Sequence, residues 1–170
     1  MVREIDVFSH AGLVLEKMGP GVFLNSSFDG VDNTMIIGWG GIQIVWGRPI
    51  FVVLVRDNRA TYSLLEQSKV FTVSVPTNNP LKQAIAICGT KSLRDFDKFE
   101  RCSLTKIPGR KVPVPIIGEC GLHYECKVVY QQTLSRGDIP EGISRRYYDN
   151  NAIHTVYYGE IVDQYLYEME

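Results

Sequence analysis

The sequence lacks any hydrophobic run long enough to span a membrane. Its longest apolar stretches are short, and Arg48 or Arg56 closes one of them, whereas a transmembrane helix needs about 20 apolar residues. Neither sign of charge dominates, because 18 basic and 19 acidic residues leave a net charge of −1. Nothing therefore indicates a nucleic-acid or membrane surface. The first residues contain no apolar signal core, so we expect a cytoplasmic protein.

The motifs of several enzyme classes are also missing. There is no Gly-x-Gly-x-x-Gly dinucleotide fingerprint, no P-loop and no C-x-x-C pair. No Cys/His cluster has metal-ligand spacing, so we expect no metal site. No paired-carboxylate or Ser/His/Asp arrangement stands out, which leaves hydrolytic chemistry without support and the catalytic residues unknown.

The four cysteines are expected to be buried free thiols rather than disulfides. They are Cys88, Cys102, Cys120 and Cys126. Cys120 and Cys126 fall in one run that is typical of a strand, so they would face the same side without bridging each other. Free cysteine commonly packs as a small hydrophobic side chain.

The 170 residues suit one domain, residues 1–170, with a full hydrophobic core. Apolar runs rich in Val, Ile, Phe and Tyr recur between turn residues, and this pattern indicates strands. Asp29-Gly30 is typical of a turn between the first two. The expected strands are Gly21–Ser27, Thr34–Trp39, 50–55 (buried on both faces), Phe71–Val75, Ile116–Tyr130 (long and bent) and Ile153–Tyr167.

Few helices are expected beside these strands, which favours a closed or partly closed antiparallel barrel. Ser92–Phe99 could hold a short helical turn, and the polar segment Ser135–Ala152 is an excursion between two long strands. The two expected helices and their ends are Thr61–Ser68, capped by Asn58 or Thr61, and Pro80–Cys88, capped by Asn79 and stopped by Gly89.

Four segments could carry chemistry. Asn33–Ile42 ends a strand in Gly-Trp-Gly-Gly, where backbone could approach a flat ligand closely; alternatively, Trp39 is a core aromatic and the glycines form a bend. Arg56–Tyr62 combines two arginines, a hydroxyl and a helix start, which could cradle a phosphate. It could equally be an ordinary helix start with solvated arginines.

The third segment, Cys88–Phe99, places hydroxyl side chains and three cations after a helix end. It could close over an anionic ligand, or it could be a solvated loop. A nucleophilic Cys88 would need a base and an electropositive, accessible site. The fourth segment contains His154, and a single histidine in a strand is more often structural than catalytic.

Taken together, these segments resemble the flavin reductase-like family with the FMN-binding split-barrel fold, and within it the flavoredoxin-type branch. The resemblance covers about residues 18–165, in the family's order and near its spacing. Its motifs are Asn33-Thr34-Met35, Trp39–Ile42, Pro49–Val55 running into Arg56 and Arg59–Tyr62, Phe71–Pro76, Cys88-Gly89, Asp95–Phe99, His154-Thr155 and Gly159–Ile161.

The resemblance implies a mainly β, six-stranded antiparallel Greek-key barrel that forms a homodimer, with FMN between the subunits. It places Asn33 and Trp39 near the flavin ring, Arg56, Arg59 and Thr61 near the phosphate, and Lys98 and His154 close to the flavin. Lys98 or His154 would suit the positive charge that favours flavin reduction. The full set of implied FMN contacts is Asn33, Thr34, Met35, Ile36, Trp39, Val55, Arg56, Arg59, Thr61, Tyr62, Cys88, Gly89, Lys98 and His154.

One departure from the family is the long segment Arg136–Asn151. It could cover the flavin as a lid, or it could be a dimer-contact arm, as Tyr147 and Tyr148 allow.

The leading functional hypothesis is an FMN-dependent oxidoreductase of flavin reductase type. Electrons from NADH, NADPH or a protein donor would pass through FMN to free flavin, ferric iron or a redox protein partner. The alternative is a non-enzymatic FMN electron carrier of flavoredoxin type. A third possibility is a split-barrel dimer that has lost flavin and serves as a ligand-binding or structural protein.

Overall fold

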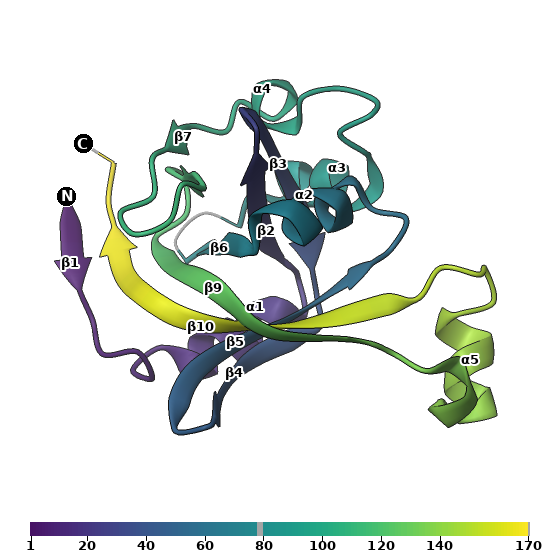
Figure 1. Cartoon of the computed structure of the whole chain (residues 1–170). Helices are drawn as coiled ribbons and strands as arrows, with labels where there is room; N and C mark the ends of the chain where they lie inside the picture. The colour runs from purple at the N-terminus through teal and green to yellow at the C-terminus, as the bar shows by residue number, and fades with distance from the viewer. Residues whose placement is uncertain (78–79, 170) are drawn as a thin grey trace.

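The chain folds around one large antiparallel sheet, seen in a computed structural model that describes residues 1–77 and 80–169 (Figure 1). The strands are β1 (Val2–Glu4), β2 (Val22–Phe28), β3 (Val31–Ile37), β4 (Gly40–Val45), β5 (Arg48–Arg56), β6 (Val70–Val75), β7 (Lys106–Ile107), β8 (Ile116–Ile117), β9 (Leu122–Thr133) and β10 (His154–Tyr167). The helices are α1 (Ala11–Met18), α2 (Ala60–Ser68), α3 (Lys82–Thr90), α4 (Lys98–Arg101), the 3-10 turn η1 (Arg136–Asp138) and α5 (Glu141–Tyr147).

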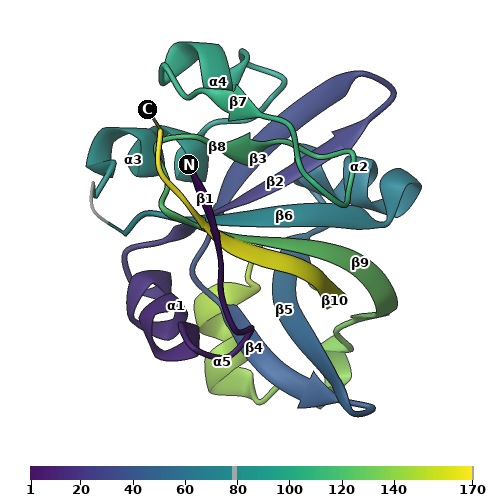
Figure 2. The same cartoon turned by 90° about the vertical axis from the view of Figure 1, so that its left-hand side faces the viewer.

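The large sheet has eight strands in the described part of the chain. Their order is β3-β2-β6-β9-β10-β5-β4, and β1 pairs with β10. The β2–β3 and β4–β5 hairpins therefore lie on opposite sides of the long strands β9 and β10 (Figures 1 and 2). The expected mainly β, antiparallel class with a few short helices is confirmed. In the large sheet, β1 and β4 are the strands beyond the six expected, and β7, which pairs with β8 in a separate two-stranded sheet, was not expected either.

β4 escaped prediction because its glycines were interpreted as a bend or a ligand contact. Gly40 begins the strand with φ +121°, and a Cβ there would lie 2.1 Å from the carbonyl oxygen of Val52 on β5. Glycine is therefore required at position 40 so that the backbones of β4 and β5 can pair closely. The expected reason, a close approach of the backbone to a ligand, does not apply here.

The turn predicted at Asp29-Gly30 is confirmed. Phe28 pairs with Val31, and the two turn residues have φ of 49° and 76°. Such a left-handed pair matches the twist of the flanking strands, as in type I′ hairpins. β3 consequently starts at Val31, three residues earlier than expected, and Asn33 lies within the strand.

The single strand expected over Ile116–Tyr130 is wrong. β8 ends at Ile117 and β9 begins at Leu122. The intervening turn contains Gly121, where a Cβ would lie 2.1 Å from Oγ1 of Thr77. Cys120 therefore precedes the strand that holds Cys126. All four cysteines are free, and only Cys102 is partly exposed.

The helices differ from prediction mainly at their ends. α2 starts one residue early and its N-cap is Arg59, without a side-chain capping bond. α3 continues past Gly89 to Thr90, and its expected cap Asn79 lies outside the described residues. The segment Ser92–Phe99 does contain a turn, in which the backbone N–H of Asp95 donates to the carbonyl of Ser92 at 3.0 Å. The helix α4 begins only at Lys98, and Asp97 caps it through the backbone N–H groups of Phe99 and Glu100. α1 and α5 were not predicted.

None of the helices in residues 1–77 and 80–169 is long and apolar enough to cross a membrane.

The main core fills the inside of the curved sheet. Phe51 of β5 and Tyr124 of β9 meet there with ring centroids 5.4 Å apart, and both are fully buried. β5 was expected to be buried on both faces, but only alternate residues towards its end are fully buried, and Leu54 is half-buried. That partly open face of β5 lines the candidate site.

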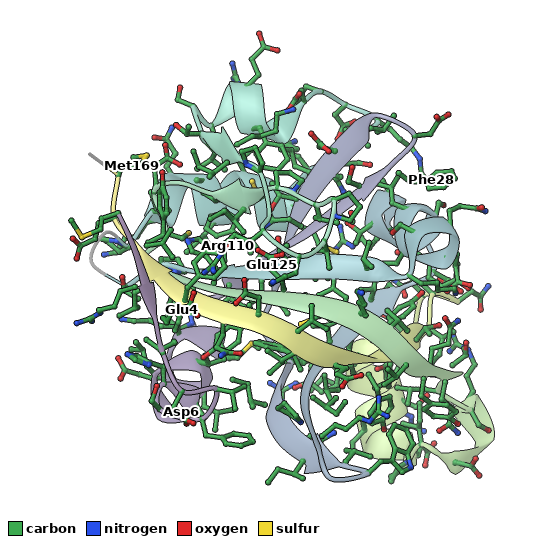
Figure 3. The ribbon with its side chains drawn as sticks, turned by 60° about the vertical axis from the view of Figure 1, so that its left-hand side comes forward. Glu4, Asp6, Phe28, Arg110, Glu125 and Met169 are labelled. Atoms are coloured by element: carbon green, nitrogen blue, oxygen red, sulfur yellow. The ribbon has the colours of Figure 1, made fainter. Side chains whose placement is uncertain are left out.

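A buried carboxylate fixes the segment before β8. Glu125 of β9 is fully buried, and its carboxylate accepts hydrogen bonds from the backbone N–H groups of Arg110, Lys111 and Val112 at 2.6–2.9 Å. Arg110 also forms an ion pair with Glu4, the last residue of β1 (Figure 3). Since buried carboxylates need such partners, we assign Glu125 a structural role.

Candidate functional site

Two adjoining cavities open between β3, the end of β5 and the start of α2. One, which we call the aromatic cavity, has a volume of about 170 Å³ and is lined by Met35–Trp39, Leu54, Arg56, Arg59 and His154. The other, which we call the polar cavity, has a volume of about 10 Å³ and is lined by Asn33, Met35, Arg59–Thr61, Cys88-Gly89, Lys91–Leu93 and Lys98. Met35 and Arg59 line both, so the two cavities adjoin, and we call them together the groove.

Strand pairing brings the distant parts of this groove together. β10 runs antiparallel to β5, with His154 opposite Arg56. The backbone N–H of Asp57 also donates to the carbonyl of Ile153 at 3.0 Å. The start of β10 is thereby held beside the β5–α2 junction, where Arg59 and Thr61 lie.

The polar cavity is built around a buried hydrogen bond. Nδ2 of Asn33 donates to Oγ1 of Thr61 at 2.8 Å. Because that oxygen accepts from Asn33, its own O–H can donate into the cavity, beside the positive end of the α2 dipole. Oδ1 of Asn33 is buried without a protein partner in the described residues. A buried acceptor left in this state calls for a donor from a ligand.

Three cations line the polar cavity, and no carboxylate is among the described residues that line either cavity. Lys98 is almost fully buried, and its Nζ donates to the carbonyls of Lys91 and Cys88 at 3.2 and 3.4 Å. Burial lowers the pKa of the Lys98 ammonium, and the positive charge of Arg59 lowers it further. An anionic ligand would offset the energetic cost of burying the positive charge of Lys98, and it would weaken the repulsion between Lys98 and Arg59.

Cys88 lies in the wall of the polar cavity and is almost fully buried. Burial is the main cause that raises the pKa of its thiol to about 12, and the nearby Cys102 adds to the rise. The resting thiol is therefore neutral, because burial outweighs the lowering influence of Lys98, and the accessible setting of a nucleophilic cysteine is absent at Cys88.

The aromatic cavity is built around Trp39, which is 41% exposed and is not the core aromatic of the alternative interpretation. Its ring lies 5.0 Å from the ring of His154 and makes an edge contact with Tyr147 at 5.1 Å. Exposed aromatic surface in a cavity suits a flat aromatic ligand.

Arg56 is committed to the Arg136–Asn151 segment. Its guanidinium donates to the carbonyl of Tyr147 at 2.7 Å and to Oδ1 of Asn150 at 3.3 Å, and it lies 5.3 Å from the ring of Tyr148. The resemblance implied a phosphate contact for Arg56, but the structure places it in the aromatic cavity, and each of its two terminal nitrogens donates to the Arg136–Asn151 segment.

His154 cannot supply the positive charge that was expected of Lys98 or His154. Its Nδ1 shares a hydrogen bond of 2.8 Å with the hydroxyl of Tyr148, which is itself buried. Burial lowers the pKa of His154 to about 4, and Arg56 and Arg59 reinforce the shift. The imidazole is therefore neutral at neutral pH.

The Arg136–Asn151 segment folds back against the aromatic cavity of its own chain. Arg136 donates to the carbonyl of Tyr148 at 2.8 Å, and Tyr147 and Tyr148 contact Trp39 and His154. α5 lies at the end of β9 and β10 that is remote from both termini (Figure 1). These contacts match the lid interpretation of the segment.

The structure brings most of the predicted contacts into one groove, but it groups them differently from the ring and phosphate sides that the resemblance implied. Asn33 and Lys98 lie with Thr61, whereas Arg56 lies with Trp39 and His154. The predicted residues in the groove are Asn33, Met35, Ile36, Trp39, Arg56, Arg59, Thr61, Cys88, Gly89, Lys98 and His154.

Three predicted contacts do not line either cavity. Val55 is fully buried in the main core, and Tyr62 is half-buried against it. Thr34 is fully buried, and its Oγ1 has no partner among the described residues. Prediction had missed Lys91 as a groove residue and Tyr148 as the hydrogen-bond partner of His154. The three cations after α3 were a signal for Lys91, but no local signal links Tyr148 to His154.

Metal chemistry has no support in the described residues, where no group of three or more His, Cys, Asp and Glu side chains could hold an ion.

Comparisons with known proteins point in one direction. Residues 15–170 match the family model of the flavin reductase like domain. An uncharacterised protein of Archaeoglobus fulgidus is 32% identical over 130 residues; the match covers 76% of this chain and 63% of that protein. The chain thus spans less than two thirds of that relative's length.

Two solved structures are similar along most of the chain. An FMN-binding domain of a flavin reductases-like enzyme from Shewanella baltica has a TM-score of 0.70 at 22% identity, covering 98% of this chain and 77% of that one. Flavoredoxin of Desulfovibrio vulgaris has a TM-score of 0.66 at 26% identity, covering 85% and 68%. The similarity to the Shewanella baltica domain shows that this chain has the split-barrel fold.

Proposed function

We propose that this chain, which belongs to the flavin reductase-like family, binds FMN non-covalently in its groove and passes electrons through it. The observation that carries the proposal is the polar cavity, where Arg59, Lys91 and Lys98 gather without a carboxylate. A phosphate dianion is the natural complement of such a cluster. The FMN-binding domain from Shewanella baltica has the same fold and supports the choice of ligand.

The residues at each end of the groove fit chemically distinct parts of FMN. Arg59 and the Thr61 hydroxyl would hold the phosphate, together with the start of α2. The unpartnered Oδ1 of Asn33 fits a hydroxyl or imide donor, both of which FMN carries. Trp39 and the backbone of β3 would border the flavin ring and exclude water from one side. Bound FMN supplies the capacity to accept and release electrons one or two at a time.

The protein's own groups would then tune and screen the flavin. Lys98 keeps a positive charge in the groove, which favours a reduced, more negative ligand. The pair Tyr148–His154 and the edge of Tyr147 border the aromatic cavity and limit what can approach it. We propose an oxidoreductase of flavin reductase type, taking electrons from NADH, NADPH or a protein donor and passing them to flavin, iron or a redox protein.

The second candidate is a non-enzymatic electron carrier. The Arg136–Asn151 segment favours it, because several hydrogen bonds hold this segment against the aromatic cavity, where a nucleotide would have to reach the flavin. The similarity to flavoredoxin adds support.

Spectroscopy separates these proposals. The purified full chain is mixed with FMN, desalted and scanned for bound flavin absorbance, then titrated anaerobically with NADH and NADPH. Retained flavin that the nucleotide bleaches supports the reductase, and retained flavin that stays oxidised supports the carrier. No retained flavin contradicts both and favours a split barrel without flavin.

We also propose a cytoplasmic homodimer. Ile44, Trp46 and Tyr130 are 66%, 63% and 46% exposed, and the rings of Trp46 and Tyr130 lie 6.1 Å apart. Grouped exposed apolar side chains are typical of protein interfaces. Analytical ultracentrifugation of the full chain tests the assembly, and a monomer at micromolar concentration would contradict it.

A further inference from the structure

A pair of thiols lies beside the groove and is not explained by flavin binding. Cys88 is in α3 and Cys102 directly follows α4, and their Sγ atoms are 3.9 Å apart. A disulfide needs about 2.05 Å between the sulfurs. Both thiols are free, so a disulfide would require the two sulfur atoms to move closer together.

The two thiols face different surroundings. Cys88 lines the polar cavity and is almost fully buried. Cys102 is partly exposed and lines a separate surface pocket together with Lys82 and Arg101. The thiolate is the reactive form of cysteine. The pair therefore reaches from a solvent-facing, positively charged pocket to the wall of the groove.

We propose that Cys88 and Cys102 form a redox site that reacts with hydroperoxides. The thiolate of Cys102 attacks the peroxide, the O–O bond breaks, and after protonation an alcohol or water leaves while Cys102 becomes a sulfenic acid. The thiol of Cys88 then attacks that sulfur, the S–O bond breaks, and water leaves as the Cys88–Cys102 disulfide forms. The two thiols supply the two electrons that reduce the peroxide.

The electrostatics of the pair support this order of events. The high pKa of Cys88 arises first from burial and then from Cys102, while Lys98 opposes both. Oxidation of Cys102 removes the thiol that contributes to the raised pKa of Cys88. The opposing influence of Lys98 remains, so Cys88 becomes easier to deprotonate at the moment when its attack is needed.

The other two cysteines serve as internal references. Cys120 and Cys126 are fully buried, and burial raises the pKa of both thiols well above the ordinary value. We therefore expect them to stay reduced under conditions that oxidise the pair.

The reduced full chain is treated with a small excess of hydrogen peroxide and is then denatured in the presence of N-ethylmaleimide, which alkylates free thiols. Its peptides are mapped by mass spectrometry. We expect two alkylated thiols per chain, at Cys120 and Cys126, and a peptide linked through Cys88 and Cys102. Dithiothreitol should restore all four. Variant Cys102→Ser should leave Cys88 reduced, and variants Cys88→Ser and Cys88→Ala should leave a sulfenic acid at Cys102 that dimedone traps.

Three results would overturn the proposal: four alkylated thiols after peroxide, a disulfide joining any other pair, or Cys102 driven to sulfinic acid in the unsubstituted chain without a link to Cys88. Because the unsubstituted chain carries the main readout, poor folding of a variant does not remove the test. The thiol measurement needs no flavin. A negative result for the Cys88–Cys102 disulfide and a negative result for FMN binding are therefore separate outcomes.

Discussion

The polar and aromatic cavities adjoin, yet they are built in opposite ways. Asn33, Thr61 and Lys98 of the polar cavity are nearly or fully buried on the sheet and its covering helices, and their polar atoms bond to one another or to nearby backbone. The aromatic cavity depends on the half-exposed Trp39 and on the Arg136–Asn151 segment folded against it. The first is built into the sheet and helices, whereas the second has a wall that only the contacts of the Arg136–Asn151 segment keep closed.

This difference suggests that the two cavities have different roles in ligand binding. A preorganised, buried charge cluster contributes most to affinity, because little ordering is needed on binding. A wall held by a few hydrogen bonds controls access instead, since opening it breaks only those bonds. Changes in the polar cavity should therefore act on FMN binding, and changes in the aromatic cavity on stability and accessibility.

The largest effect is expected from removing the anion ligands. The double variant Arg59→Ala/Thr61→Ala should weaken FMN binding by about a hundredfold or more, because each charge-assisted partner is worth about 1.5–3 kcal/mol. Quenching of flavin fluorescence measures the affinity, and Arg101→Ala, a cation outside the groove, is the matched control. Unchanged affinity in the double variant would remove the phosphate from the polar cavity.

Acid should destabilise the protein through its buried neutral histidines. The pKa of His154 is lowered to about 4 in the folded chain, against about 6.5 when unfolded. The unfolded state therefore binds more protons between these values, so stability is lost as pH falls from 6.5 to 4, by roughly 3 kcal/mol for His154. His123, buried with its pKa also lowered to about 4, acts in the same direction.

Urea unfolding across this pH range measures the loss. His154→Asn should reduce the slope of stability against pH, whereas His10→Asn, outside both cavities, should preserve it. Equal slopes in the two variants would show that His154 is not held neutral by its surroundings.

A smaller effect is expected from loosening the wall of the aromatic cavity. Tyr148→Phe removes the 2.8 Å bond to His154 and leaves a buried nitrogen without its partner, which costs about 1–3 kcal/mol. We expect a Tm lower by several degrees and little change in FMN affinity. Tyr130→Phe, at an exposed tyrosine, is the control. A large loss of FMN affinity in Tyr148→Phe would contradict the division between the cavities.

The smallest effect is expected at Trp39. Trp39→Ala should weaken FMN binding by about threefold to tenfold, since an aromatic contact adds about 0.5–1.5 kcal/mol, and it should shift the visible flavin spectrum. Phe28→Ala removes an exposed aromatic side chain that lines neither cavity and is the comparison. If Trp39→Ala left both the spectrum and the affinity unchanged, the flavin ring would lie elsewhere.

Local patterns predicted much of the fold. Apolar runs between turn residues located β2, β5, β6 and β10 to within a few residues, and Asp29-Gly30 correctly marked the first hairpin. Errors arose where a glycine serves a distant backbone, as Gly40 does against Val52. α5 escaped because its polar sequence has no buried side and is held only by contacts to other segments.

The sequence by itself determined the β-rich class, the family resemblance and most of the side chains that line the groove, because these depend on residue type and on order along the chain. Only the tertiary structure decided how they are grouped. The pairing of His154 with Arg56 across β10 and β5, the bond from Asn33 to Thr61 and the contact of Cys88 with Cys102 join residues from separate elements. Such contacts depend on strand register and helix packing, which no local pattern of residues specifies.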